Sequence, residues 1–340
     1  MIALLSKNSL FRYLLIFIFL AGFSSPTMAS EGSDGEEKFD VSAVIMHHVL
    51  DDHIWHFFDG HYGTLYLPVI VYSEERGFEM FSSSNFYDEH HNIIEYNGYR
   101  LEHNHIYLGE QQVLDLSITK NVAMLFLTAF LVFLVMRSVA KGYERNRGRA
   151  PKGIQSFMEP VILFVTDEVI KPNAGPKADR YVPYLLTLFF FILFGNILGL
   201  LPGAANMTGN IAVTMVLAIF TFLITNLSGN KGYWGHIFWT PGVPLPLRLI
   251  ILPVEIIGVF TKPFALMIRL FAAITAGHIV VLSLLCMAFI FHSYAVGIGA
   301  SIFVTLINLI ELLVAGIQAY VFTLFSSLYI GMATEEHEHH

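Results

Sequence analysis

The sequence is poor in charged side chains and almost lacks cysteine. Only 14% of its 340 residues are Asp, Glu, Lys or Arg, whereas soluble globular domains carry about 25%. A single cysteine, Cys286, excludes an internal disulfide framework, and its apolar surroundings favour a small buried hydrophobe. The sequence has no Walker A motif and no basic stripe with interleaved aromatic residues. We therefore expect neither catalytic ATP binding nor nucleic-acid binding.

Apolar residues are abundant: they make up 55% of the chain and include 30 phenylalanines. That composition is typical of an integral membrane protein. Its charge is divided unevenly along the sequence. Residues 31–115 contain 17 acidic and 3 basic residues, a net charge of −14, and the remainder contains 10 and 16, a net charge of +6. We expect an acidic, water-exposed segment joined to a mildly basic membrane portion.

Residues 1–29 have the pattern of a secretory signal peptide. Lys7 and Arg12 flank the start of an apolar run over 13–23, and the small residues that follow favour cleavage before Ser30. The run falls short of the about 20 residues that a membrane span needs. An uncleaved anchor is the alternative interpretation.

Residues 30–116 are predicted to form a small α+β extension outside the cytoplasm. Thr64–Tyr72 is typical of a strand, and Asn97-Gly98 indicates a hairpin turn. The segment also holds nine histidines, which are either metal ligands or solvated surface residues. Their spacing matches no zinc framework, so we expect no metal site. They are His47, His48, His53, His56, His61, His90, His91, His103 and His105.

Residues 117–340 are predicted to form an all-α integral membrane domain with five transmembrane helices. Asn121–Met136 is expected to be the first span, and the six basic residues within 137–152 mark the cytoplasmic side. The amphipathic segment 154–171 is expected to be a helix on the cytoplasmic surface.

The rest of the membrane domain contains four more expected spans. Residues 181–230 carry no charge, which favours spans at 181–201 and 208–228 joined by a Pro-Gly turn. A loop over 229–248 would then return to the cytoplasm. Residues 249–333 predict a long helix hairpin, broken near 291–297, that ends in the cytoplasm.

Three ionisable residues, Arg269, His278 and Glu311, interrupt the apolar sequence of this hairpin. A charge at mid-bilayer costs about 3 to more than 10 kcal/mol, and such residues usually mark an ion path. Arg269 cannot release its proton, whereas His and Glu can exchange protons near neutral pH. The alternative is a structural ion pair between Arg269 and Glu311.

Helix geometry sharpens the hypothesis of an ion path. In one helix over 249–290, His278 would lie about 13 Å outward of Arg269, and Glu255 about 21 Å inward. Gln318 follows Glu311 by two turns and shares its face. Asn308 either forms a hydrogen bond in helix packing or lines the channel. The arrangement predicts two offset aqueous half-paths separated by a permanent positive charge.

The motifs of the hairpin resemble those of subunit a of the F-type ATP synthase. Arg269–Phe271 followed by Thr275–His278 is similar to the signature of that family. The resemblance covers about 117–336, and its other motifs are Arg137–Lys141, Asn196–Pro202, Gln318–Phe322 and Tyr329–Ala333.

The resemblance implies a proton-translocating stator without catalysis or cofactors of its own. Arg269 would face the carboxylates of the c-subunit ring, and His278 and Glu311 would line the half-channel open to the outside. Gln318 would lie near Arg269, and Glu255 at the cytoplasmic exit. Further partners would be a b-type peripheral stalk, the F1 head through that stalk, and lipid. The location would be the bacterial inner membrane, with the extension outside.

Two positions depart from the family pattern, which makes the outer half-channel harder to predict. Ala273 stands where many members have Asn, and Gly199 where many have a carboxylate. Two other function classes stay open. A stand-alone cation channel or transporter would show internal repeats, and none is visible. A non-conducting scaffold would tolerate Arg269→Lys.

Overall fold

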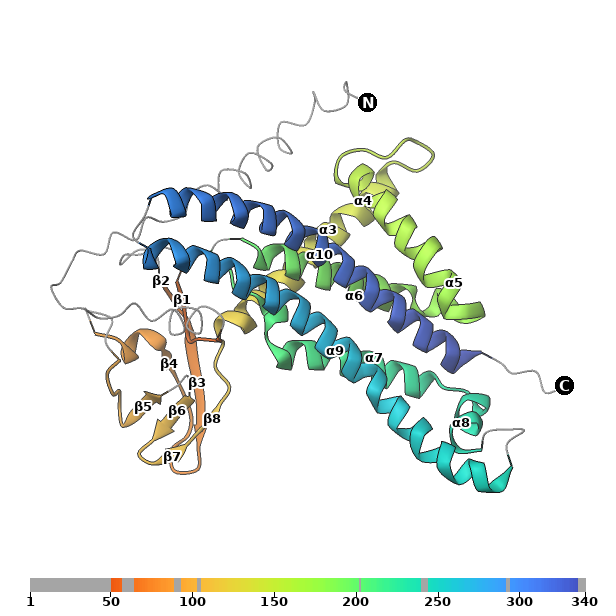
Figure 1. Cartoon of the computed structure of the whole chain (residues 1–340), viewed down its shortest axis with the longest axis horizontal. Helices are drawn as coiled ribbons and strands as arrows, with labels where there is room; N and C mark the ends of the chain where they lie inside the picture. Colours follow the sequence, from red (N-terminus) through yellow and green to blue (C-terminus); the bar gives the residue numbers. More distant parts are fainter. Residues whose placement is uncertain are drawn as a thin grey trace. The chain divides into compact units, whose positions relative to one another are not determined.

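The computed structural model describes residues 50–56, 64–88, 93–102, 105–201, 203–239, 244–291 and 294–335 (Figure 1). The chain divides into two compact units. The first comprises Met1–Leu125, Ile197–Met207 and Ile279–Asn308, and the second comprises Phe126–Asn196, Thr208–His278 and Leu309–His340. The expected signal peptide and most of the nine histidines lie outside the described residues.

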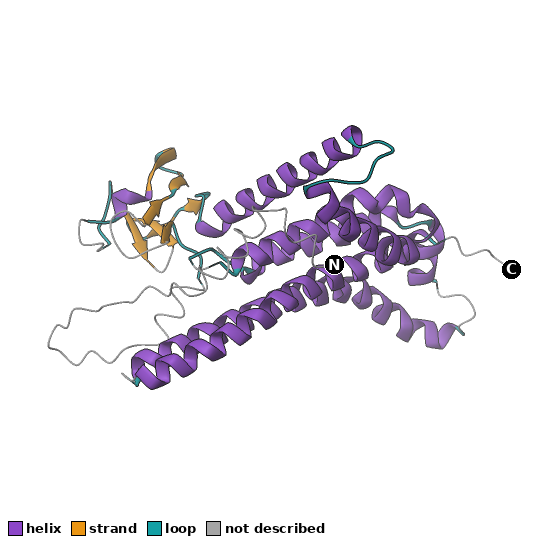
Figure 2. Cartoon of the chain, turned by 90° about the horizontal axis from the view of Figure 1, so that it is seen from above, coloured by secondary structure: helices purple, strands orange, loops and turns teal. Residues whose placement is uncertain are grey.

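The described part of the extension consists of short antiparallel strands in three sheets (Figure 2). β1 pairs with β2, β3 is the middle strand of the order β4-β3-β8, and β6 is the middle strand of the order β5-β6-β7. The strands are β1 Ile54–His56, β2 Thr64–Tyr66, β3 Pro68–Ser73, β4 Gly77–Ser82, β5 Tyr99–Glu102, β6 His105–Leu108, β7 Gln111–Gln112 and β8 Leu114–Asp115. Among these described residues the only helix is a short 3-10 turn, Ser83–Phe86. The β part of the expected α+β extension is confirmed.

The core of the extension lies between the sheets. Val69 and Val71 alternate with outward residues along β3, as the two-residue period of a strand dictates. They are fully buried and pack in one cluster with Phe86, Tyr99 and Ile106.

The expected strand Thr64–Tyr72 is wrong in its continuity, because β2 and β3 belong to different sheets. Pro68 opens β3 and has no N–H with which to continue a ladder. The Leu67 N–H, between the two strands, donates to Ser83 Oγ at 3.0 Å and to the His53 carbonyl at 3.4 Å.

The expected turn at Asn97-Gly98 is confirmed. Both residues have positive φ, 51° and 79°, which is the geometry of a two-residue type I′ turn. Tyr96 and Tyr99 exchange backbone hydrogen bonds of 3.0 and 2.8 Å across it.

Five helical segments in the described part of the chain are long and apolar enough to cross a membrane. They are Lys120–Arg145, Ile154–Gly199, Ile211–Ser228, Pro246–Met287 and Tyr294–Thr334. The individual helices are α3 Lys120–Arg145, α4 Ile154–Leu163, α5 Lys171–Ala174, α6 Ala178–Gly199, α7 Ile211–Ser228, α8 Lys231–Phe238, α9 Leu245–Ile290 and α10 Tyr294–Thr334.

Three features of the helical part differ from the expectations. The first helix continues past Met136 to Arg145. The segment 154–171 is not one regular α-helix, because a π-helical stretch, Phe164–Ile170, lies between α4 and α5. The expected loop over 229–248 contains α8, which begins after Asn230. The side chain of Asn230 caps α8 by accepting from the Tyr233 N–H at 2.7 Å.

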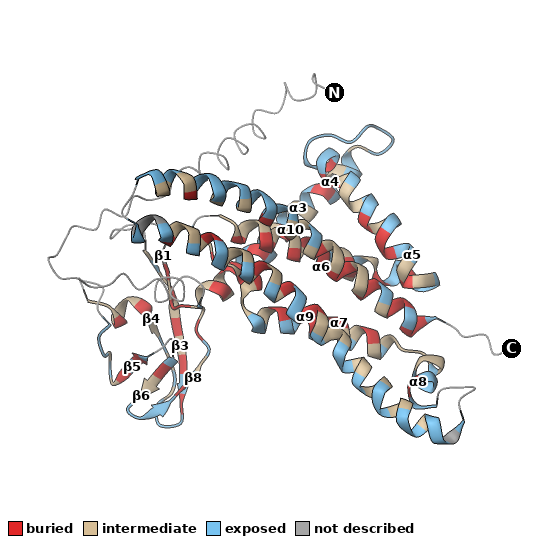
Figure 3. Ribbon diagram, viewed as in Figure 1, coloured by how far each residue is buried: buried red, intermediate tan, exposed pale blue. Residues whose placement is uncertain are grey.

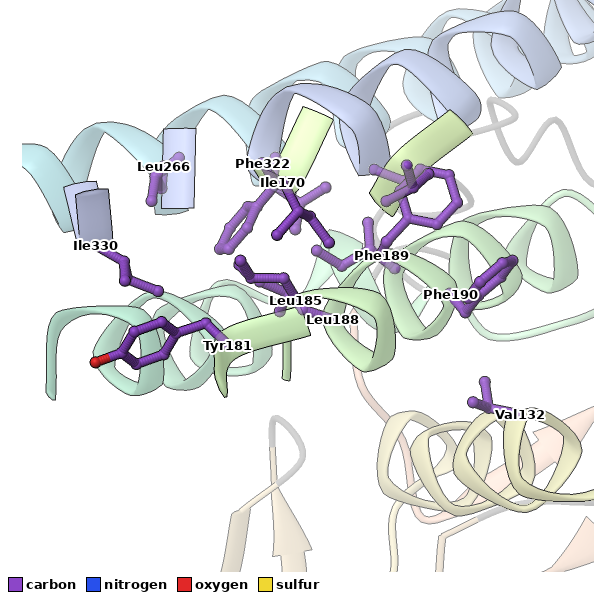
Figure 4. Close-up of a cluster of buried hydrophobic side chains, with 14 of the residues drawn as sticks. Val132, Ile170, Tyr181, Leu185, Leu188, Phe189, Phe190, Leu266, Phe322 and Ile330 are labelled. Atoms are coloured by element: carbon purple, nitrogen blue, oxygen red, sulfur yellow. The ribbon is translucent and has the colours of Figure 1, made fainter. Parts of the chain in front are cut away.

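An apolar cluster holds the second unit together (Figure 4). Leu185, Phe190 and Ile192 of α6 are fully buried in it, as are Ile170 of the π-helical stretch and Ile330 of α10. Many large apolar side chains on α9 and α10 are instead exposed (Figure 3). Exposed apolar surface along helices of this length suits contact with lipid.

Candidate functional site

The hairpin of α9 and α10 carries the ionisable residues singled out in the sequence. Three contacts within the second unit define the antiparallel register of α9 and α10. Lys262 lies over the ring of Tyr329, Arg269 over the ring of Phe325, and Gly277 against Glu311. Residue numbers thus rise along one helix as they fall along the other.

Arg269 is an exposed cation on an apolar helix. Its neighbours Leu266, Met267 and Leu270 are buried, whereas its guanidinium carbon lies 4.6 Å from the centre of the Phe325 ring. Among the described residues no carboxylate forms an ion pair with it. The alternative of a structural ion pair between Arg269 and Glu311 is therefore wrong. The positive charge points outward, supported by a cation–π contact.

Glu311 is a buried carboxylate that packs on a glycine. Its side chain is 7% exposed, and its Oε1 atom has no hydrogen-bond partner within the described part of the chain. Oε1 occupies the space that a side chain on Gly277 would need, and an ideal Cβ there would lie 3.0 Å from both Cγ and Cδ of Glu311. Burying such a group without partners is costly, so its retention in an apolar helix favours a functional role.

His278 follows Gly277 and therefore lies at the level of Glu311 along the hairpin. It is half-buried and does have an interaction partner. The two residues expected to exchange protons on the same side of Arg269 thus lie at one level along the hairpin.

Gln318 lies midway along α10 between Glu311 and Phe325, and is half-buried. The contact of Arg269 with Phe325, seven residues further along α10, sets Gln318 about 10 Å along the axis from the guanidinium, between the levels of Arg269 and Glu311. Asn308 is exposed and belongs to the first unit, so no packing hydrogen bond accounts for it among the described residues.

Glu255 is half-buried near the other end of α9. A small hollow of about 10 Å³, with room for about one water molecule, lies in the same part of the second unit and is lined by residues of α7, α8, α9 and α10. Burial raises the pKa of Tyr233, which lines the hollow, and the Glu255 carboxylate raises it further. The polar lining residues are Thr221, Thr225, Asn226, Tyr233, Lys262 and Tyr329.

A short hydrogen-bond chain leads into this hollow. Tyr184 OH lies 2.9 Å from Thr221 Oγ1, which lies 3.3 Å from Ser326 Oγ. These residues did not stand out in the sequence, because isolated Thr, Ser and Tyr are common in membrane helices. The only available signal was the place of Tyr184 and Thr221 in the uncharged stretch 181–230, and Ser326, on α10, lies outside it.

The position of Gly199 explains one departure from the family pattern. A Cβ at Gly199 would lie 3.3 Å from the backbone of Asn206 and 3.2 Å from its Oδ1 atom. A side chain at position 199 would require Asn206 to shift by a few tenths of an ångström. Asn196 is buried in the second unit, where it accepts from Thr208 Oγ1 at 2.8 Å and donates to the Ala315 carbonyl at 3.4 Å.

Outside the hairpin, one His–Asp pair is buried in the extension. His53 Nε2 lies 2.8 Å from Asp115 Oδ2, and His53 is 2% exposed. Burial alone would raise the pKa of Asp115, but the hydrogen bonds from His53 and Ser117 outweigh it and lower that pKa. In the described part of the chain, no group of three His, Cys, Asp or Glu residues is arranged to hold a metal ion.

Comparison with known proteins gives matches over most of the chain. A family model described as "ATP synthase A chain" matches residues 122–331, and one described as a domain of unknown function matches residues 44–123. "ATP synthase subunit a 2" of Chlorobaculum tepidum is 40% identical over 319 residues, which cover 92% of this chain and 78% of that protein. "ATP synthase subunit a" of Pelodictyon phaeoclathratiforme is 39% identical over 333 residues, which cover 94% of this chain and 85% of that protein. "ATP synthase subunit a" of Chloroherpeton thalassium is 46% identical over 231 residues, which cover 66% of this chain and 69% of that protein.

Proposed function

Because the chain belongs to the ATP synthase A chain family, we propose that its α9–α10 hairpin forms two proton half-channels against the c ring, separated by Arg269. The chain is a proton-translocating stator component of the Fo sector of the F-type ATP synthase, and it has no catalysis of its own. What we propose is how its residues perform this function.

The exposed, unpaired Arg269 is the observation that carries the proposal. A permanent positive charge on an apolar helix surface needs an anionic partner, and the described residues of this chain offer it none. A carboxylate of a c subunit would meet that need. The nearby guanidinium would favour its ionised form, and a proton could not pass directly through a group that never deprotonates.

The half-channel on one side of Arg269 would use His278 and Glu311. The Glu311 carboxylate is buried against Gly277 and has little water around it. Its uptake and release of a proton would therefore depend on the groups that lie next to it. His278, at the same level, would exchange protons with it or with water. Gln318, about two turns along α10 from the Phe325 ring under Arg269, would position the passing carboxylate or a water molecule.

The half-channel on the other side would include Glu255 and the small hollow. Hydroxyl, amide and ammonium groups stand among the apolar groups of its lining, and one water molecule held by them would extend the path. Asn308, exposed on α10 three residues before Glu311, would line the entrance of the outer half-channel.

The membrane arrangement follows from the span count and the charge bias. We propose five spans, a cleaved signal peptide over 1–29, and an extracytoplasmic extension over 30–116. The membrane domain over 117–340 would end in the cytoplasm of a bacterial inner membrane. The b-type stalk would connect this domain to the F1 head.

The test is proton pumping by inverted membrane vesicles on addition of ATP. We expect Arg269→Ala and Arg269→Lys to abolish acidification while the c ring still co-purifies. Lys keeps the charge but lacks the planar group that stacks on Phe325. The matched control is Arg145→Ala, at the exposed end of α3, which should pump normally. Normal pumping by Arg269→Lys would support the scaffold hypothesis instead.

A further inference from the structure

One face of the β4-β3-β8 sheet in the extension is apolar and carries no charge. The register pairs Tyr72 with Phe78 and with Leu114, and pairs Ile70 with Met80, so these side chains share a face. Phe78 and Met80 are 72% and 71% exposed. The full set of residues on this face is Pro68, Ile70, Tyr72, Phe78, Met80, Ser82, Leu114, Leu116 and Ile118.

The rest of the extension has the opposite character. Residues 31–115 carry a net charge of −14, and the inward side of the same three strands holds Glu79 and Asp115 beside the core valines. A sheet exposed to water normally places charged side chains on its outer face. Exposed apolar patches of this kind mark interaction sites.

The sheet is joined to the first membrane helix without a flexible linker. Beyond β8, the Leu116 N–H donates to the Ile70 carbonyl at 2.8 Å, and the Ile118 N–H donates to the Pro68 carbonyl at 3.1 Å. Ladder pairing with β3 thus continues to within two residues of α3.

The beginning of α3 is held by the same unit. Asp51 accepts from the Asn121 N–H at 3.1 Å and from Thr119 Oγ1 at 2.8 Å. Lys120, where α3 begins, is four positions after Leu116, so Leu116 lies at most about 14 Å from the helix start.

We propose that this uncharged face lies on the bilayer interface, in the leaflet at which α3 begins. Its tether keeps it within reach of that interface, which is several Å thick. Tyr is enriched at the level of the lipid headgroups, and Phe and Leu are typical of apolar faces that lie in the interface. A protein partner would be expected to meet a polar rim around the whole apolar centre, whereas the exposed charged residues Glu74, Glu75 and Arg76 border this face only at the β3–β4 turn.

The topology of the sheet sets the depth of insertion. β4 and β8 are its edges, and open strand edges do not enter the hydrocarbon region. Only the side chains of the face would insert, about 5–10 Å into the boundary between headgroups and acyl chains. Because no basic residue takes part, zwitterionic lipid should suffice, and added salt should not release the face.

Spin labels on the full-length chain, in its complex reconstituted into phosphatidylcholine vesicles, test this proposal. In a Cys286→Ala background, one label is attached at Phe78→Cys and a second, in a separate variant, at Met80→Cys. Both positions are exposed, so neither label disturbs the core. The matched control is a label at Gln111→Cys, exposed on β7 of the other sheet. Power saturation then measures contact with oxygen, which concentrates in lipid, and with a water-soluble nickel chelate.

We expect oxygen to relax the labels at residues 78 and 80 several-fold more than the nickel chelate does, with the order reversed at residue 111. The same order should persist in 0.5 M salt, a concentration at which the Debye length is below about 8 Å. Strong contact with nickel at residues 78 and 80 would mean that the face is simply hydrated. Low contact with both reagents would mean that a protein or a second copy covers it. Either result would overturn the proposal.

Discussion

Replacing Gly277 by Ala is expected to slow proton translocation through Glu311. The added Cβ would lie 3.0 Å from Cγ and Cδ of Glu311 and closer still to Oε1, whereas carbon atoms in contact normally lie about 3.5–4.0 Å apart. Either the two helices separate or the carboxylate moves by about 0.5–1 Å. Overpacking of this size costs about 1–3 kcal/mol.

If that cost falls on the proton-accepting geometry of Glu311, the rate decreases by about 5- to 150-fold. The assay is ATP-driven acidification of inverted vesicles, with the amount of co-purified c ring as the check on assembly. Gly258→Ala is the matched control, because it lies on the same helix and its added Cβ would have no atom within 4 Å. Both substitutions gain the same helix propensity, so only the contact with Glu311 differs between them.

A second substitution separates the contact from a general loss of packing. Glu311→Asp shortens the side chain by one methylene, so combining it with Gly277→Ala should cost less than the sum of the two single effects. If the assembled Gly277→Ala complex pumps as fast as the Gly258→Ala complex, the reasoning about Glu311 is refuted. If the double variant shows strict additivity, the two residues do not act through contact.

Three further predictions concern the hairpin and the extension. His278→Ala and Glu311→Ala should each slow translocation severely, and unchanged proton flux between pH 6 and 8 would remove these roles. Because the folded pKa of Asp115 is lowered, its carboxylate stabilises the extension above its unfolded pKa, near 4, and this contribution is lost as the pH falls through the folded value. Asp115→Asn should therefore weaken the protection of the Leu116 amide from hydrogen exchange at pH 7 by about 1.5–3 kcal/mol. If the protection in this variant decreased with falling pH as much as it does in the wild type, the reasoning would be contradicted. Gly98→Ala should destabilise the extension by about 1–2 kcal/mol through its positive φ, seen as faster exchange of the Tyr99 amide; an unchanged exchange rate would show that the turn geometry is not needed.

Much of the helical part could be predicted from the sequence, because the signals that define it are local. An apolar run long enough to span a bilayer is visible in the order of residues alone, and five helices of that kind are present. The two-residue turn at Asn97-Gly98 was equally clear, since few residue pairs accept two positive φ angles. Where the signal was weak, as for α8 in the expected loop over 229–248, the prediction was wrong.

The candidate site was predicted in its residue types but not in its contacts. Arg269, His278 and Glu311 stood out because ionisable residues are rare in apolar helices. Which of them meet depends on the register between α9 and α10, which no periodicity within one helix contains. Only the folded hairpin shows that Glu311 packs on Gly277 and that Arg269 lies over Phe325.

The sequence by itself determined the membrane character of the chain, the order of its helices and the presence of a fixed cation among them. These properties depend on the composition of the chain and on the spacing of residues along it. The tertiary structure decided which side chains lie together: the close approach of Gly199 to Asn206, the small hollow lined by Tyr233 near Glu255, and the uncharged outer face of the β4-β3-β8 sheet. Each of these requires residues far apart in the chain to meet, and that is decided by packing rather than by local pattern.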